Sequence, residues 1–554
     1  MKRELEKLSS RTFDVLVVGG GIHGALAVWD ATLRGLSAAL IERGDFGSAT
    51  SQNSLKIIHG GLRYLQDGNP FRIRTMARER TTWMRIAPHL VHPLTCLTPT
   101  RQKFLRSRMA MGVALAVNDL LSFDRNRSMD VEKHLPAGSV VPRQELSRLL
   151  PGYQVNDSTG AAVWHDAQIH NSERLLLEFL LSADREGAVV ANYVEATGFL
   201  QQDRRIHGVT ARDVLTGQVF DVQARVVINC AGAWEAELLQ GAGIRSEYAT
   251  SVAMNLIVDQ VWSQAAAGLP SKPMNERLPQ ILFFVPWRNR TMIGTWHLPW
   301  NDSPKKFKIM NAVVQKFIDE INSAHPALRL SLDDVQHVTW GFLPVNRQDA
   351  RGESVRLTRD GVVIDHQAKD GRAGLISVLG VKYTTARAVA EQAVDLAMKK
   401  LAVKGKKCQT HTIPIHGGWI GDFKAFLGQA LIESPRLKNE EIVEHLVYTH
   451  GSEYKHFLQE MMEQPALRER IDPQQPVTAA EVIHAVRHEM AISLADVIQR
   501  RTELGATGLP AYPVLQKCAK LMGCEMGWTT EHQQQEIEAV IQKYPIRKVE
   551  RVPA

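Results

Sequence analysis

Short apolar runs separated by a glycine-rich turn open the chain. Residues 15–18 form a continuous apolar run, which is typical of a buried parallel strand. Gly35 ends the helix that follows the turn, and residues 38–41 form the next apolar strand. The apolar face of that helix comprises Ala25, Leu26, Val28, Trp29 and Leu33. The succession of strand, turn, helix and strand predicts an α/β unit.

The turn itself has the spacing Gly19-x-Gly21-x-x-Gly24. The first glycine permits a tight turn, the second lets the backbone approach a pyrophosphate, and the third lets the helix pack closely on the strand. Free N–H groups and the positive end of the helix dipole then face the phosphates. Glu42 ends the second strand and is placed to accept hydrogen bonds from a ribose diol. This context predicts a dinucleotide cofactor.

Two later joints between a strand and a helix decide which cofactor is expected. An apolar strand at residues 226–229 ends in Cys230-Ala231-Gly232, and another strand runs through Gly380 into a long amphipathic helix. After Glu42 the chain enters a polar stretch instead of continuing the strand and helix alternation of a plain NAD domain. Three separated joints suit a large two-part cofactor, so we expect FAD on a doubly wound sheet that a substrate domain interrupts.

Length and composition indicate an ordinary folded protein with more than one domain. The chain has 554 residues, of which 44% are hydrophobic and 23% charged, and this length exceeds what a single core accommodates. It has no apolar run of membrane-spanning length and no signal-peptide pattern, so we expect a cytoplasmic protein. Its 5 cysteines have neither a disulfide framework nor zinc-ligand spacing, so reduced thiols and no metal are expected.

The net charge of +7 suits an anionic substrate, an anionic membrane surface or nucleic acid. No nucleic-acid-binding motif or long basic stripe accompanies the charge, so nucleic acid is not an expected partner. Residues 101–128 combine an apolar stretch with Arg101, Lys103, Arg106 and Arg108. This segment is either an amphipathic element on the inner face of the cytoplasmic membrane that delivers electrons to quinone, or a packed helix with basic ends.

Seven segments resemble the FAD-dependent glycerol-3-phosphate dehydrogenase and oxidase family of the respiratory, aerobic type. They span nearly the whole chain in the family's order, and the second and the last are far more specific than a glycine triplet. The segments are VVGGGIHGA, ATSQNSLKIIHGGLRYL, INCAGAW, FFVPWRNRTMIGT, LTRDGVVIDH, GLISVLGVKYTTAR and EVIHAVRHEMAISLADVIQRRTELG.

The resemblance implies three structural parts. These are an FAD-binding doubly wound domain of the glutathione-reductase and D-amino-acid-oxidase type, an interleaved antiparallel substrate-capping domain and a C-terminal α-helical domain. Within an oxidoreductase region at 12–410, FAD-binding segments at about 12–90, 150–250 and 350–410 alternate with capping segments at about 91–149 and 251–349. The helical domain covers 411–554. Its charged residues Arg487, Glu489, Arg500 and Arg501 are expected to make domain contacts rather than to catalyse.

The resemblance also assigns residues to the cofactor. The polar loop after the second strand is expected to line the FAD, and a later helix N-terminus is expected to meet the flavin and stabilise negative charge on its reduced form. The assigned residues are Thr50, Ser51, Ser54, Lys56, His59, Gly60 and Leu62 in the loop, and Gly232, Gly380, Lys382 and Thr384 later in the chain.

Arg63, Tyr64, Arg359 and Lys382 match the family's substrate site. The resemblance implies that they bind sn-glycerol 3-phosphate, through an arginine fork and a lysine charge on the phosphate, while hydride passes to flavin N5 and dihydroxyacetone phosphate forms. Lys382 is also a candidate to polarise the substrate oxygen or to take its proton. Alternatively, Arg63 and Tyr64 brace the FAD loop and Arg359 is a surface residue.

The substrate positions depart from the family in three places. Leu343, in GFLPV, stands where the family has a phosphate-clamping arginine, and Asn255, in MNLIVD, replaces a histidine. The segment GTWHLPW introduces Trp296 and His297. His297 is a candidate general base because its unperturbed pKa lies near neutrality, or it is a buried structural histidine. Losing an arginine fork weakens phosphate binding by about one to four decades.

Three functions therefore compete. The first is a glycerol-3-phosphate dehydrogenase that passes electrons to quinone. The second keeps FAD but acts on another small hydroxy compound or a modified phosphate. The third is a flavoprotein binding module with little turnover, against which the retained Arg63, Tyr64, Arg359 and Lys382 argue. The electron acceptor (quinone, oxygen or a protein), covalent attachment of the flavin and the oligomeric state, a homodimer included, stay open.

Overall fold

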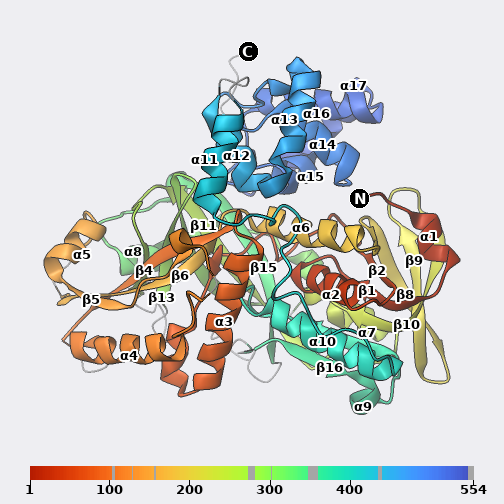
Figure 1. Ribbon diagram of the computed structural model, residues 1–554, viewed down its shortest axis with the longest axis horizontal. Coiled ribbons are helices and arrows are strands. Elements are labelled where there is room, and N and C mark those ends of the chain that lie inside the picture. The colour runs from red at the N-terminus through yellow and green to blue at the C-terminus, as the bar shows by residue number, and fades with distance from the viewer. Residues whose placement is uncertain are drawn as a thin grey trace.

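The computed structural model describes residues 1–102, 106–127, 129–154, 157–271, 281–300, 302–346, 358, 360–434 and 439–546. Two sheets lie side by side, and the C-terminal helices, in blue, lie above both (Figure 1). This arrangement confirms the expected α/β architecture of three parts. Among the described residues, no helix is both long enough and apolar enough to cross a membrane.

The first sheet is the doubly wound layer that the opening pattern predicts. Its order is β16-β17-β10-β1-β2-β7, parallel except at the antiparallel β16–β17 edge, with β8 and β9 extending from β10. Strand β1 is central and almost wholly buried, which explains its unbroken apolar run. The strands are β1 (Phe13–Val18), β2 (Ala38–Ile41), β7 (Val189–Ala191), β8 (Val194–Gln202), β9 (Arg205–Asp213), β10 (Val219–Asn229), β16 (Val362–Asp365) and β17 (Leu375–Leu379).

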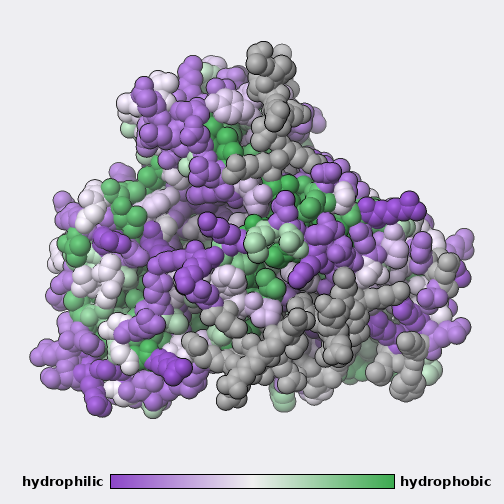
Figure 2. Space-filling model, turned by 180° about the vertical axis from the view of Figure 1, so that it is seen from behind, coloured by the Kyte–Doolittle hydropathy of each residue, from purple (hydrophilic) through white to green (hydrophobic). Residues whose placement is uncertain are grey.

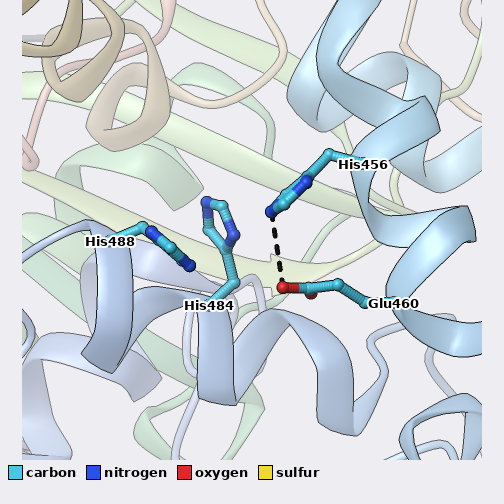
Figure 3. Close-up of side chains that lie close together, drawn as sticks. All are labelled: His456, Glu460, His484 and His488. Carbon is cyan, nitrogen blue, oxygen red and sulfur yellow. Dashed lines mark ion pairs between the residues drawn. The ribbon is translucent and has the colours of Figure 1, made fainter. Parts of the chain in front are cut away.

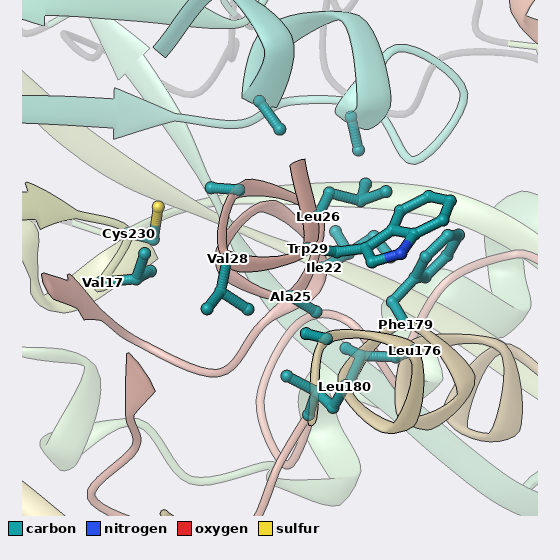
Figure 4. Packing of buried hydrophobic residues seen from close by; sticks show 14 of the residues in the cluster. Val17, Ile22, Ala25, Leu26, Val28, Trp29, Leu176, Phe179, Leu180 and Cys230 are labelled. Atoms are coloured by element: carbon teal, nitrogen blue, oxygen red, sulfur yellow. The ribbon is translucent and has the colours of Figure 1, made fainter. Parts of the chain in front are cut away.

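Helices α2, α6 and α10 pack together against this sheet. Trp29 of α2 contacts Phe179 of α6 with ring centroids 5.2 Å apart, on the opposite side of α2 from Val17 and Cys230 (Figure 4). Truncating either buried ring to alanine would cost about 3–5 kcal/mol. The helices of this part are α1 (Leu5–Ser10), α2 (Ile22–Leu33), α6 (Ser172–Arg185), α7 (Glu235–Gln240), α9 (His366–Asp370) and α10 (Ala386–Leu401).

The second sheet has the order β15-β11-β14-β13-β12-β4-β6-β3, with β5 beside β6. It is antiparallel except where β12 meets β4. Strand β6 lies in this sheet, which extends the antiparallel layer past the boundary expected at residue 149. The strands are β3 (Ile57–Ile58), β4 (Val91–Thr100), β5 (Ser139–Pro142), β6 (Gly160–Ile169), β11 (Tyr248–Asp259), β12 (Ala266–Pro270), β13 (Ile281–Trp287), β14 (Arg290–Trp300) and β15 (Val335–Asn346). The helices are α3 (Pro70–Ile86), α4 (Arg108–Leu121), α5 (Arg143–Leu149) and α8 (Asn311–Ala324).

The C-terminal helices have their own hydrophobic core, and their outer surface is largely hydrophilic on the face in Figure 2. Arg500 and Arg501 reach across to the buried Asp45 of the first domain, and Glu489 binds Arg174. The expectation of domain contacts is confirmed for these three residues, whereas Arg487 binds Glu525 within its own domain. The helices are α11 (Phe423–Glu433), α12 (Glu440–His450), α13 (Tyr454–Glu463), α14 (Ala479–His488), α15 (Leu494–Asp496), α16 (Tyr512–Met526) and α17 (Thr530–Gln542).

Candidate active site

A cavity of about 1810 Å³ runs from the glycine turn of the first sheet to strands β11, β14 and β15 of the second. This volume is larger than the usual range of about 300–1,000 Å³ for a small-molecule site, and it accommodates a large ligand with a smaller one beside it. Residues expected to bind cofactor or substrate line much of it: Gly19, Gly21, Glu42, Thr50, Ser51, Ser54, His59, Leu62, Arg63, Tyr64, Gly232, His297, Gly380, Lys382 and Thr384.

The glycine turn is closely packed. Gly19 has a φ of +112°, which favours glycine, and a Cβ on Gly24 would lie 1.9 Å from the Gly19 carbonyl oxygen. Gly24 does not line the cavity, so it acts as the packing glycine. The Glu42 carboxylate accepts hydrogen bonds from Gly20 N at 2.7 Å and Gly44 N at 2.9 Å. Burial raises the pKa of Glu42. Glu42 therefore braces the turn in addition to facing the cavity.

Two loop residues expected to bind the cofactor are placed elsewhere. Lys56 is 2% exposed and does not line the cavity. Its ammonium group donates to Ser172 Oγ at 2.6 Å and to the Glu173 carboxylate at 2.8 Å. Gly60 also lies outside the cavity lining, and a Cβ there would lie 1.9 Å from Arg80 Nη1. Both residues therefore anchor and shape the loop, and their direct contact with FAD stays a prediction.

Asp166 on β6 connects this loop to the second sheet, and sequence reasoning missed it. One carboxylate oxygen accepts from Gly60 N at 2.6 Å and from Arg80 Nη1 at 3.0 Å, and the other lies 3.2 Å from His59 Nδ1. Although burial alone raises it, the His59 hydrogen bond and the Arg80 charge lower the pKa of Asp166 to about 2. The only signal in the sequence was an aspartate within a largely apolar strand, because its partners His59 and Arg80 lie far away in the chain.

His23, a second residue that sequence reasoning missed, lies where the glycine turn meets the later strand–helix joint at Gly380. A Cβ on Gly380 would lie 1.8 Å from His23 Cε1, so the two segments touch only because residue 380 is glycine. Thr384 Oγ1 accepts from His59 N at 3.1 Å. Burial lowers the pKa of His23 to about 4, so its imidazole is neutral at pH 7. The signal was the histidine inside the glycine turn GGGIHG.

Several of the side chains that line the cavity are basic. Arg63, Arg106 and Lys382 line it, and the Lys382 ammonium lies near the ring of Tyr64. Arg359, the fourth residue expected to bind substrate, lies outside the described residues. Because several cationic groups face one space, that space suits an anionic ligand.

His297 lies beside this basic group. Burial, with a smaller contribution from the Arg63 charge, lowers the pKa of His297 to about 4. Within the described part of the chain, its buried Nδ1 has no hydrogen-bond partner. The imidazole is therefore neutral at pH 7, with ring nitrogen available to a ligand.

The three departures from the family do not all face the cavity. Leu343 and Asn255 line it, and the Asn255 amide donates to Asn53 O at 3.0 Å and accepts from Thr295 Oγ1 at 3.0 Å. Trp296 does not line the cavity: it stacks on Phe317 and donates to Glu320 in the core beneath α8. Its assignment to the substrate site was wrong, because successive residues of a strand point to opposite faces.

Comparisons with known proteins identify the family of the chain. Residues 14–396 match the family model described as FAD dependent oxidoreductase, and residues 408–533 match the C-terminal domain of alpha-glycerophosphate oxidase. A glycerol-3-phosphate dehydrogenase from Synechocystis is 30% identical over 98% of this chain and 97% of its own. The mitochondrial glycerol-3-phosphate dehydrogenase of Mesocricetus auratus is 30% identical over 95% of this chain and 72% of its own.

A solved structure shares the whole fold. The crystal structure of glycerol-3-phosphate dehydrogenase from Bacillus halodurans complexed with FAD has a TM-score of 0.77 and 24% identity, and the match covers 99% of both chains. At this identity the match establishes the fold.

Proposed function

Because the chain belongs to the FAD-dependent oxidoreductase family, we propose that it oxidises sn-glycerol 3-phosphate to dihydroxyacetone phosphate. Relatives that match nearly the full chain and are named glycerol-3-phosphate dehydrogenase support this substrate. Bound FAD supplies the acceptor for the hydride that leaves the secondary carbon. The observation that carries the proposal is one cavity that is lined both by the glycine turn and by Arg63 and Lys382, with Lys382 beside Tyr64.

The turn and its neighbours fit FAD. A Cβ on Gly21 would lie 3.2 Å from Ser51 Oγ, so a larger residue would crowd the surface that faces a pyrophosphate. Ser54 Oγ is buried and, among the described residues, has no hydrogen-bond partner, so it is available to a cofactor. At the other end, glycine at 380 lets its segment pack directly against His23. These residues hold the two halves of the cofactor across the first sheet.

At the substrate end, different side chains bind the phosphate and accept the hydroxyl proton. Arg63 and Lys382 hold the phosphate, since a guanidinium fork and an ammonium group both bind phosphate strongly. His297 accepts the hydroxyl proton as hydride leaves, which requires the neutral imidazole that its lowered pKa provides at pH 7. Tyr64 positions Lys382 through its ring face.

Anaerobic spectroscopy tests the proposal. The purified protein should be yellow, and millimolar glycerol 3-phosphate should bleach the flavin absorbance without oxygen. An intact flavin spectrum after addition of the substrate would refute glycerol-3-phosphate oxidation, while bleaching by dithionite in the same cuvette confirms that the flavin is reducible.

A second candidate retains FAD and changes the substrate. Leu343 offers no charge to a phosphate, and the Asn255 amide is already hydrogen-bonded to the protein. Both line the cavity, so a different small hydroxy compound or a modified phosphate also fits. A panel of hydroxy acids, polyols and phosphate esters, scored by anaerobic bleaching, separates the two candidates. Faster bleaching by an unphosphorylated compound than by glycerol 3-phosphate favours this one.

We also propose that the protein docks on the inner face of the cytoplasmic membrane and reduces quinone there. Helix α4 presents Met109, Val113 and Leu120 to solvent at 77%, 62% and 72% exposure, beside Phe123 and Phe71. This apolar face with nearby arginines fits an anionic bilayer surface. Leu120→Glu with Phe123→Glu should abolish sedimentation with anionic vesicles but not flavin bleaching. Unchanged sedimentation refutes docking through α4. Sedimentation velocity of the protein without vesicles distinguishes a monomer from a homodimer.

A further inference from the structure

Four side chains that commonly bind metal ions lie together in the C-terminal domain, apart from the cofactor cavity. His456 and Glu460 come from α13, and His484 and His488 come from α14 (Figure 3). One ligand atom from each lies within 4.8 Å of all the others, and His456 Nε2 is 3.3 Å from Glu460 Oε1. Three of them, all but Glu460, line a separate cavity of about 500 Å³.

The spacing within each helix explains why the four meet. His456 and Glu460 are four residues apart, as are His484 and His488, so each pair occupies one face of its helix. Two histidines at this spacing on one helix recur in zinc enzymes. Because α13 packs on α14, the two pairs face each other. A tetrahedral ion with ligand bonds of about 2.0–2.1 Å needs its ligand atoms roughly 3.3 Å apart, which small side-chain rotations can reach.

Two atoms of the cluster are buried without a partner. Within the described residues, neither His484 Nδ1 nor Glu460 Oε2 has a hydrogen bond. Buried polar atoms normally have one, so each points to a missing ligand. The other nitrogen of His484 lies 3.5 Å from the Glu489 carboxylate, which is itself held by Arg174. A histidine held by a carboxylate on one nitrogen and free on the other is the usual support for a metal ligand.

The amino terminus of the chain lies beside the cluster. The amino group of Met1 donates to the His488 carbonyl at 2.8 Å, and Asp184 lies 3.7 Å from it and offsets its charge.

We propose that these four side chains bind one divalent ion of the zinc class and thereby link α13 to α14. Three imidazoles and a single carboxylate suit zinc and its late first-row neighbours, whereas magnesium and calcium prefer oxygen ligands. Four protein ligands leave no open position, so the ion is structural. It stabilises the C-terminal domain where Arg174 of α6 joins it.

Metal titration of the full-length holoprotein tests this proposal. After chelator treatment and dialysis, Zn²⁺ should bind at about one equivalent per chain, Mg²⁺ should not bind, and Co²⁺ should give the strong visible absorption of a tetrahedral site. His456→Gln and His488→Gln, at exposed positions, should each weaken Zn²⁺ affinity at least about 10-fold, the lower end of the loss seen when even an outer-shell partner is removed. His532→Gln, at an exposed histidine on α17, is the matched control.

Thermal denaturation gives an independent measurement. Zn²⁺ should raise the melting temperature of the wild-type protein and of His532→Gln, and should leave His456→Gln unchanged, because an ion that binds only the folded state stabilises it. Absence of stoichiometric Zn²⁺ binding by the wild-type protein would overturn the proposal. Equal affinity in the wild-type protein and both cluster variants would overturn it as well, whatever the outcome of the flavin experiments.

Discussion

The ammonium group of Lys382 lies 4.4 Å from the centre of the Tyr64 ring. The two residues come from segments more than 300 positions apart in the sequence. The contact brings the substrate-binding loop after the glycine turn together with the joint that leads into α10. Because a cation over an aromatic face is attracted to it, Tyr64 fixes the direction in which Lys382 points its charge.

Replacing Lys382 with methionine should impair substrate binding without removing the cofactor. The lost charge-assisted bond is worth about 1.5–3 kcal/mol, so kcat/KM for glycerol 3-phosphate should fall about 10- to 150-fold. Steady-state kinetics measure the effect, and the flavin-to-protein absorbance ratio should stay constant. Lys399→Met, at an exposed lysine of α10, serves as the control. Unaltered kcat/KM in Lys382→Met would remove this residue from the substrate site.

Adding a methyl group at Gly380 should displace the cofactor. The new Cβ would lie 1.8 Å from the His23 ring, which lines the cofactor cavity and would have to move, disturbing the cavity wall. Gly380→Ala should therefore purify with much less FAD, as measured by the ratio of flavin to protein absorbance. Gly198→Ala is the matched control, because a Cβ there meets nothing within 4 Å. Full FAD occupancy in Gly380→Ala contradicts the close approach.

The pH dependence of kcat/KM should report His297. Burial and Arg63 lower its pKa to about 4, so the free enzyme should lose activity through this residue only as the pH falls toward 4. Removing the neighbouring positive charge in Arg63→Gln makes protonation easier, and the acidic limb should therefore move to higher pH. Profiles of both proteins normalised to their maxima measure the shift. An acidic limb near pH 6.5 that is the same in both proteins would mean that the limb does not report a His297 whose pKa is lowered by Arg63.

Neutralising Asp45 should destabilise the junction between domains. Its carboxylate receives Arg500 Nε at 2.5 Å and Arg501 Nη2 at 2.7 Å, and these two charges hold its pKa far below the usual range although burial opposes them. Asp45→Asn leaves two buried guanidiniums underpaired, at a cost of about 3–5 kcal/mol. Urea denaturation followed by tryptophan fluorescence measures the loss. Glu525→Gln, which removes the intradomain partner of Arg487, should cost only about 0–1 kcal/mol.

Local periodicity predicted those parts of the fold that follow from neighbouring residues. The glycine turn, the strand that ends at Glu42 and the FAD-type sheet could be predicted because spacing in the chain fixes them. Trp296 was misplaced although the alternation of a strand contains the answer: His297 and Thr295 face the cavity, and the residue between them faces α8. Applying the period of two to GTWHLPW would have corrected the assignment.

Other features depend on contacts between distant segments. The ion pair that holds Lys56 involves Glu173, and the arginine that requires glycine at position 60 comes from α3. The cluster of His456, Glu460, His484 and His488 was missed for the same reason, because its two pairs come from separate segments of the sequence. A search for cysteine spacing could not find it. Such relationships form only when helices and sheets pack, so single-segment patterns do not contain them.

Strand β3 is two residues long, yet it pairs with Gln168 and Ala167 of β6 and belongs to the same loop that lines the cofactor cavity. Order in this loop is therefore shared between ligand affinity and the attachment of the loop to the second sheet. Such coupling is reciprocal: if FAD tightens the β3–β6 pairing by some factor, a change that loosens the pairing weakens FAD by that factor. Amide hydrogen exchange at Ile57 and Ile58, compared with and without bound FAD, measures this coupling.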